Sequence, residues 1–175
     1  ANVQDSEIIE NGPTIIYRTS DLQITNMVKT QGPDVSYLGT DLVYQVDVSN
    51  VGNLANTDDF APTFMFFVPK GTTIDPANVV FTSTTGATLN GVAEVFEVVG
   101  SDLIAYRVKV NMPEDSQGRF VIPVHVTEDI TIPRIDAWGA IMRSHDTTDP
   151  NATNTNLEIV PFDPFLEANG VQKEV

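Results

Sequence analysis

Apolar and polar residues alternate with a period of two along much of this chain. Apolar side chains recur at every second position in segments 41–48, 103–110 and 120–126, and less regularly in 22–28. Successive side chains of a β-strand point to opposite faces, so the pattern predicts strands with one buried and one solvent-exposed face. Such half-buried strands are typical of antiparallel sheets. Further strands are predicted at 13–18, 62–69, 78–84, 93–99, 135–143 and 157–162.

Turn-forming residues separate these segments. Clusters of Gly, Pro, Asn, Asp and Ser predict turns at 31–34, 50–53, 69–71, 90–91, 100–102 and 116–118. No segment has the periodicity of an amphipathic helix, and only short helical turns are expected, near 56–60 and 75–78. Many short strands with regular turns predict an all-β fold, an antiparallel β-sandwich.

The strand pattern divides the chain into one domain and two arms. The β-sandwich is expected to span residues 20–161, and 175 residues with 41% hydrophobic content are enough to bury a real core. Residues 1–19 and 162–175 are polar arms with embedded apolar residues. No signal peptide is visible, which leaves open whether a leader was removed or the chain is an excised domain.

The net charge narrows the choice of partners. Lys and Arg number 9 against 24 Asp and Glu, giving a formal charge of −15 and a pI near 4.1. Such a field repels phosphate backbones and anionic lipid, so neither nucleic acid nor membrane insertion is expected, and the longest apolar run, 64–68, is too short to span a bilayer. The alternative explanation of this negative charge is that an acidic surface only keeps the protein soluble. The lack of cysteine excludes disulfides, thiolate metal sites and a cysteine nucleophile.

Five short motifs follow one another along the chain. Asp-Leu at 21–22 is followed by Gly-Thr-Asp at 39–41, which leads into Tyr-x-Val-x-Val-x-Asn-x-Gly at 44–52; Val-Pro-x-Gly follows at 68–71 and Asp-x-x-Asp-Pro-Asn at 146–151. In order and spacing, residues 21–161 resemble the repeat domain of prokaryotic cell-surface proteins called domain of unknown function eleven. The resemblance implies an immunoglobulin-like extracellular module of adhesins, surface layers and appendages, and it does not imply an enzyme.

Candidate catalytic chemistry is sparse. His125 lies in a predicted strand and is expected to point outward, without a zinc-ligand partner at suitable spacing. His145 adjoins Asp146, but no motif places a nucleophile beside them. The adjacent acids at 58–59, 114–115 and 128–129 are expected to be solvated turn residues. Trp138 is expected to lie in the core rather than on a sugar-binding platform.

Calcium is the one cofactor that the residues favour. Calcium takes about 6–8 oxygen ligands, and two loops are rich in carboxylate and amide oxygens. The alternative is that these side chains only cap their own turns. Asn151 also begins an Asn-Ala-Thr glycosylation sequon. The candidate calcium ligands are Asp146, Asp149, Asn151, Asn154 and Asn156 in one loop, and Asp58 and Asp59 in the other.

The arms carry apolar residues that a solvated tail would not need. Docked on a neighbouring copy, they would complete an open sheet by strand addition and build a filament. Alternatively, 13–18 is an edge strand of its own sheet and 162–175 is a linker to an adjoining domain. The candidate assembly residues are Ile8, Ile9, Ile15, Ile16, Tyr17, Phe162, Phe165 and Leu166.

The sequence therefore predicts a non-enzymatic structural subunit of an extracellular cell-surface assembly. It would polymerise with copies of itself by β-strand addition, with calcium stiffening its loops, in a filament, sheath or surface layer. Two alternatives stay open: a single module of a long adhesin stalk beside adjoining surface-protein domains, and a module that binds carbohydrate, such as a surface glycan, or protein.

Overall fold

The computed structural model describes residues 7–11, 14–33, 38–127, 135–142 and 156–162. It gives the backbone alone for 7–11, 14–18, 156–162 and positions 135, 136, 138 and 142. Within these residues the regular structure is almost entirely β-strand. Two single-turn 3-10 helices, η1 (Asp58–Phe60) and η2 (Pro76–Asn78), fall where short helical turns were expected. No helix of the described segments is long and apolar enough to cross a membrane.

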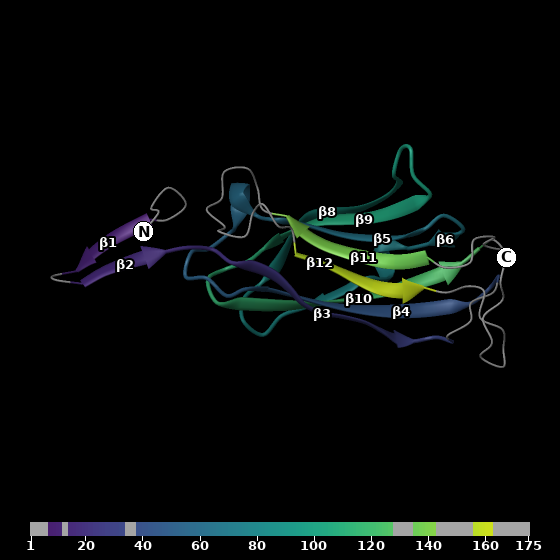
Figure 1. Ribbon diagram of the computed structural model, residues 1–175, viewed down its shortest axis with the longest axis horizontal. Helices are drawn as coiled ribbons and strands as arrows, with labels where there is room; N and C mark the ends of the chain where they lie inside the picture. The colour runs from purple at the N-terminus through teal and green to yellow at the C-terminus, as the bar shows by residue number, and fades with distance from the viewer. Residues whose placement is uncertain (1–6, 12–13, 34–37, 128–134, 143–155, 163–175) are drawn as a thin grey trace.

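The described strands form two five-stranded antiparallel sheets and a separate two-stranded one (Figure 1). The β10 sheet has the order β3-β4-β10-β6, and β7 also pairs with β10; its strands are β3 (Leu22–Gln31), β4 (Asp41–Asn50), β6 (Thr72–Thr73), β7 (Val80–Thr82) and β10 (Ser116–Val126). The β5 sheet has the order β12-β11-β5-β9-β8; its strands are β5 (Thr63–Pro69), β8 (Thr88–Glu97), β9 (Leu103–Asn111), β11 (Ile135–Met142) and β12 (Asn156–Phe162). The third sheet is the hairpin of β1 (Glu7–Asn11) and β2 (Thr14–Arg18).

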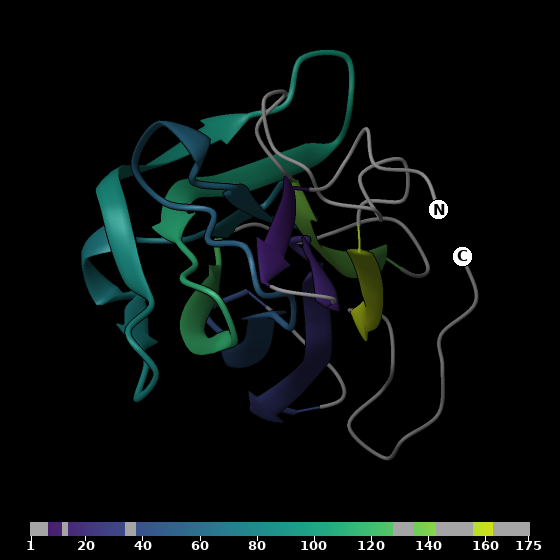
Figure 2. The same cartoon turned by 90° about the vertical axis from the view of Figure 1, so that its left-hand side faces the viewer.

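The two five-stranded sheets pack face to face, which confirms the predicted antiparallel β-sandwich (Figures 1 and 2). The alternating apolar residues of both sheets point into the space between them and are almost fully buried. Aromatic rings fill the centre: Phe64 of the β5 sheet stacks on Phe120 of the β10 sheet, with ring centroids 4.0 Å apart. Burial of such alternating apolar faces is the main favourable contribution to folding.

Two predicted turns lie inside strands instead. Residues 90–91 belong to β8, where the register with β9 shifts between Asn90 and Glu94, and Gly91 adopts the positive φ of 97° that the local irregularity requires. Residues 116–118 begin β10. Gly118 is buried there because the ring of Phe81 lies against it: an added Cβ would come within 2.3 Å of that ring. Both glycines therefore serve strand geometry rather than a reversal of the chain.

Asn50 holds one end of the sandwich together. Its Oδ1 accepts hydrogen bonds from the backbone N–H groups of Asp21 and Gly52, at 3.0 and 3.1 Å. Its Nδ2 donates to the carbonyl oxygens of Leu54, Met112 and Pro113, at 2.9, 3.2 and 3.2 Å. One buried amide thus joins β4, the segment before β3 and the segment after β9.

Gly52 is required at the same place by close packing. An added Cβ would lie 2.1 Å from the carbonyl oxygen of Thr19, which belongs to a different segment of backbone. The Asn-x-Gly part of the motif at 44–52 is therefore explained by structure: the Asn supplies hydrogen bonds and the Gly allows two backbones to touch.

Candidate functional site

The N-terminal hairpin is the most unusual part of the molecule. β1 and β2 pair with each other, with Ile8 opposite Tyr17 and Ile9 opposite Ile16, and they lie beyond one end of the sandwich (Figure 1). β2 is therefore not an edge strand of either five-stranded sheet. Apolar residues occupy consecutive positions of the hairpin, which a period of two assigns to opposite faces. Ile15 completes the set predicted from sequence, opposite Glu10.

Such a hairpin is an incomplete structure. A two-stranded hairpin alone is only marginally stable in water, and no further strand pairs with either outer edge in the part of the chain that is described. Each outer edge offers a row of backbone N–H and C=O groups to another strand. Within the described residues, both outer edges of the hairpin are therefore unpaired.

The sandwich itself offers one long open edge. On one side, β12 contacts β3 of the other sheet, which closes that side of the sandwich. On the other side the β10 sheet ends in β6 and β7, of two and three residues, whereas the β5 sheet ends in β8, of ten residues. β8 and β3, of ten residues each, are thus the longest described edge strands, and β8 is the one on the side away from the contact between β3 and β12.

The C-terminal assembly residues are described only in part. Phe162 ends β12, where its Cα lies opposite that of Ile135. Phe165 and Leu166 lie outside the described residues. A role for them in assembly stays a prediction.

The calcium ligands predicted for the loop before β12 cannot be compared with the structure. Asp146, Asp149, Asn151 and Asn154 lie outside the described residues, as does the sequon at 151–153, and Asn156 is described only as the first backbone position of β12. This loop as a calcium site, and Asn151 as a glycosylation site, stay predictions.

The second predicted calcium loop forms η1. Asp58 and Asp59 are exposed, Asp58 has a φ of 56°, and its N–H donates to Asn111 Oδ1 at 2.9 Å. Asn53 lies apart from them, where its Oδ1 accepts from the N–H of Thr19 at 2.7 Å. In the described part of the chain, no three His, Asp or Glu side chains gather as a metal site would require.

The histidine in β10 makes a local surface contact. His125 is 47% exposed, as the alternation predicts, and its Nδ1 lies 2.6 Å from Asp41 Oδ1 on the neighbouring strand β4. No serine or threonine hydroxyl is hydrogen-bonded to the ring in the described structure. The pair has an acid and a base but lacks the nucleophile that a catalytic triad needs.

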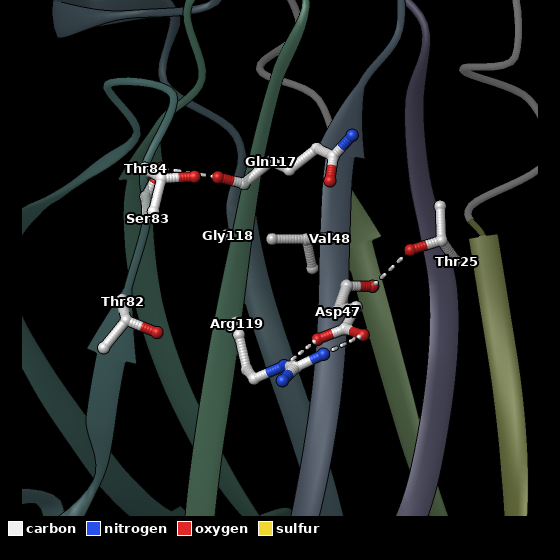
Figure 3. A pocket seen from close by; sticks show the side chains of 9 residues that line it. All are labelled: Thr25, Asp47, Val48, Thr82, Ser83, Thr84, Gln117, Gly118 and Arg119. Atoms are coloured by element: carbon white, nitrogen blue, oxygen red, sulfur yellow. Dashed lines mark hydrogen bonds and ion pairs between the residues drawn. The ribbon is translucent and has the colours of Figure 1, made fainter.

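A polar groove crosses the outer face of the β10 sheet (Figure 3). Its volume is about 330 Å³, and it was not foreseen from the sequence because its residues come from four separate strands and a turn. Ser83 Oγ donates to the carbonyl oxygen of Gln117, which fixes the turn at one wall. The groove is lined by Thr25, Asp47, Val48, Thr82, Ser83, Thr84, Gln117, Gly118 and Arg119.

An ion pair forms the floor of this groove. Arg119 Nε and Nη2 donate to the two carboxylate oxygens of Asp47, at 2.7 and 3.1 Å (Figure 3). The hydrogen bond to Asp47 and the charge of that carboxylate raise the pKa of Arg119 above its ordinary value. Since the two groups satisfy each other, the groove presents hydroxyl and amide groups but no free charge. This suits a structural cross-strand pair better than a catalytic site.

No protein-family model matches this chain, and neither does any curated protein. Among solved structures the chain is similar to the major pilin SpaA of Corynebacterium diphtheriae, with 14% identity and a TM-score of 0.49 over 76% of this chain and 33% of that one. It is similar to the T6 backbone pilin of Streptococcus pyogenes, with 11% identity and a TM-score of 0.45 over 84% of this chain and 35% of that one.

A third solved structure is of a different kind. AvmM, which catalyses macrocyclization in alchivemycin A biosynthesis, is 9% identical with a TM-score of 0.43, over 89% of this chain and 94% of that one. The chain thus spans about a third of the length of the two pilins and nearly all of AvmM. At TM-scores below 0.5 these likenesses carry no argument about function.

Proposed function

We propose that this chain is a non-enzymatic structural subunit of an extracellular assembly on a cell surface, such as a filament, sheath or surface layer. Subunits join by β-strand addition between copies. The observation that carries the proposal is the β1–β2 hairpin, which lies beyond the sandwich and belongs to neither of its sheets (Figure 1). The acidic surface and the sparse catalytic chemistry of the described residues support the same conclusion.

The position of the hairpin favours open-ended polymerisation. The hairpin lies at one end of the sandwich, and β8 is an edge along its side, so the two surfaces that would meet are different. A contact between two different surfaces does not close on itself after two copies but propagates from copy to copy. Backbone hydrogen bonds between β2 or β1 and β8 would hold each junction.

Deletion of residues 1–19 tests the proposal. The full-length chain is expected to form elongated particles in electron microscopy and high-mass species in size-exclusion chromatography, and the deletion is expected to leave a folded monomer. A single substitution in the full chain, Ile16→Pro, should act like the deletion, since proline removes a backbone N–H from β2. Ile16→Val is the matched control and should assemble normally. Unchanged polymerisation after deletion would show that strand donation by the hairpin is wrong.

Cysteine cross-linking tests the acceptor edge. The chain has no cysteine, so introduced thiols are the only ones present. Copies carrying Ile16→Cys mixed with copies carrying Val92→Cys in β8 should form disulfide-linked dimers under assembly conditions. Val99→Cys is the control, because Val99 is as exposed as Val92 (98% and 90%) but lies beyond the end of β8. Equal cross-linking at both valines would argue against β8 as the acceptor.

The same measurements separate the subunit from a module of an adhesin stalk. A stalk module is expected to be monomeric at all protein concentrations, with or without residues 1–19. Growth of particles with increasing protein concentration would favour the subunit.

A further inference from the structure

The bulge in β8 opens a hollow on the outer face of the β5 sheet. Between Asn90 and Glu94 the register with β9 shifts, so Gly91, Val92 and Ala93 have no partners on β9. An added Cβ on Gly91 would meet no atom within 4 Å. The hollow beside the bulge has a volume of about 450 Å³ and is lined by Thr63, Asn90, Gly91, Val92, Glu94, Arg107, Val108 and Lys109.

The strand register places three different rows of residues across this outer face. The first row is polar: Asn90 pairs with Lys109, which pairs with Thr63. The second row is Glu94, Arg107 and Met65, and the third is Phe96, Ala105 and Phe67. Residues two apart on a strand point to the same face about 7 Å from each other. The face therefore changes from hydrogen-bonding groups to aromatic rings over a short distance.

The register of the third row continues onto the next strand, β11. Phe67 pairs with Trp138 of β11, whose neighbours Ala137 and Gly139 face the core: Ala137 is fully buried, and a Cβ on Gly139 would touch Met27 and Ile24. The expectation that Trp138 belongs to the core stays a prediction, because only the backbone is described at position 138.

In the second row, the charges of Arg107 and Glu94 are already paired with each other. Arg107 Nη2 lies 2.6 Å from Glu94 Oε2, and its guanidinium lies over the ring of Phe96, 4.6 Å from the centroid. These two contacts hold Arg107 flat against the aromatic row. The charge of Arg107 is therefore neutralised, and its guanidinium extends the flat surface formed by the aromatic row.

Lys109 is in a different position. It is exposed in the first row, beside the hollow, and its ammonium group has no hydrogen bond or ion pair in the described structure. Three other cationic side chains of the described residues, Lys70, Arg107 and Arg119, each form an ion pair with an acid. Lys70, for comparison, lies 3.7 Å from Glu97. Lys109 thus supplies a positive charge for a group that comes from outside.

We propose that this face binds a sugar chain that carries carboxylate groups. The C–H face of a pyranose ring packs on the Phe67 ring and on the Arg107 guanidinium that covers Phe96, and its hydroxyls meet Asn90 and Glu94 in the hollow. Lys109 binds the carboxylate, and this unmatched charge is why an acidic sugar fits better than a neutral one. The site lies on the other sheet from the groove at Asp47 and does not depend on assembly through the hairpin.

Asn90 is suited to its part in this site. Its Nδ2 already donates to the carbonyl oxygen of Asp58 and to Asn111 Oδ1, at 3.0 and 3.1 Å. These bonds fix the orientation of the amide, and Oδ1 is left as the acceptor for a sugar hydroxyl. A prepositioned acceptor lowers the entropy cost of binding.

Titration of the full chain with sugar oligomers tests the proposal. The probes are an oligogalacturonate of six units and cellohexaose, a neutral oligomer of equal length, with binding measured by isothermal titration calorimetry. Trp138 is the only tryptophan, so its fluorescence during the titration gives a second readout from a single site. We expect saturable binding of the oligogalacturonate, at least fivefold tighter than that of cellohexaose.

Matched lysine variants make the outcome decisive. Lys109→Ala should weaken oligogalacturonate binding at least fivefold and leave cellohexaose binding unchanged, whereas Lys70→Ala should change neither. Equal losses in both variants would show unspecific attraction of anions and would overturn the proposal, as would the absence of binding by either sugar. Phe96→Leu should weaken both sugars. If it instead changes the oligomeric state without sugar, the face is an interface between copies and the proposal is wrong.

Discussion

Asn50 Nδ2 donates a hydrogen bond to the carbonyl oxygen of Met112, which lies 62 residues further along the chain, at 3.2 Å. This is one of five hydrogen bonds that a single fully buried amide makes with the segments around it. These bonds tie β4 to the segments before β3 and after β9, so this end of the sandwich depends on Asn50.

Asn50→Ala is therefore expected to lower the free energy of unfolding by about 3 kcal/mol or more, because it leaves buried backbone donors and acceptors without partners. Urea denaturation followed by circular dichroism measures the change. Asn78→Ala is the control: Asn78 is exposed, and the loss should stay within about 0.5 kcal/mol. Equal effects of the two substitutions would contradict the role given to Asn50.

Gly118→Ala is expected to destabilise the protein by about 1–3 kcal/mol, because the new methyl group would overlap the ring of Phe81. The double variant with Phe81→Leu should lose less stability than the sum of the two single changes, since the smaller side chain vacates the space. Thermal unfolding of the four proteins of this cycle gives the coupling free energy. Additive losses would mean that Phe81 does not limit residue 118.

Tyr44→Phe is expected to be neutral or stabilising by about 1 kcal/mol at pH 7. The side chain of Tyr44 is fully buried, and its hydroxyl has no hydrogen-bond partner among the described residues. Removing an unsatisfied buried hydroxyl costs no hydrogen bond and relieves desolvation. A loss of more than about 1 kcal/mol in chemical denaturation would indicate that the hydroxyl is bonded.

Alkaline pH should unfold the wild-type chain more readily than the tyrosine variants. Burial raises the pKa of Tyr106 to about 12 and raises that of Tyr44 further. A raised pKa in the folded state means that stability is complete below the unfolded value, near 10, and falls as the pH rises through the folded value. Tyr44→Phe and Tyr106→Phe should each move the alkaline unfolding midpoint upward in a pH titration of circular dichroism. An unchanged midpoint would exclude ionisation of the buried tyrosines as the cause.

Calcium removal tests the ligands predicted at 146–156 and at Asp58 and Asp59. If calcium binds, the melting temperature should rise with added calcium and fall with chelator, as for any ligand that binds only the folded state. Asp146→Asn with Asp149→Asn should abolish the shift if the first loop is the site, and Asp58→Asn with Asp59→Asn if it is the second. Equal melting temperatures with calcium and with chelator would exclude both loops as calcium sites.

Most of the fold follows from local sequence. Alternation of apolar residues in 41–48, 103–110 and 120–126 marks β4, β9 and β10, because burial of one sheet face imposes a period of two on the sequence. The same rule fails where glycine serves a contact made in three dimensions. From the sequence alone, Gly118 is predicted to be a turn residue. In the structure, glycine is needed there because the ring of Phe81, from a distant strand, lies against it.

The surfaces were harder to predict than the core. The strand propensity of 13–18 is visible in the sequence, but its partner at 7–11 is not, since Ile8 and Ile9 are surrounded by polar residues. The groove at Asp47 and Arg119 and the row through Phe96 and Phe67 depend on the register between strands that are far apart in the chain. Register is set by the packing of the whole sandwich and cannot be obtained from any one segment.

The contact between β3 and β12 constrains the order in which this protein can fold. β3 is the first strand of the sandwich and β12 is the last described strand, so the side that they close cannot form until residue 162 is available. A chain growing from its N-terminus would remain open along that side until residue 162 has been made, and contacts between such distant residues form slowly. Closure of that side is therefore a late event, after every other described strand has been made.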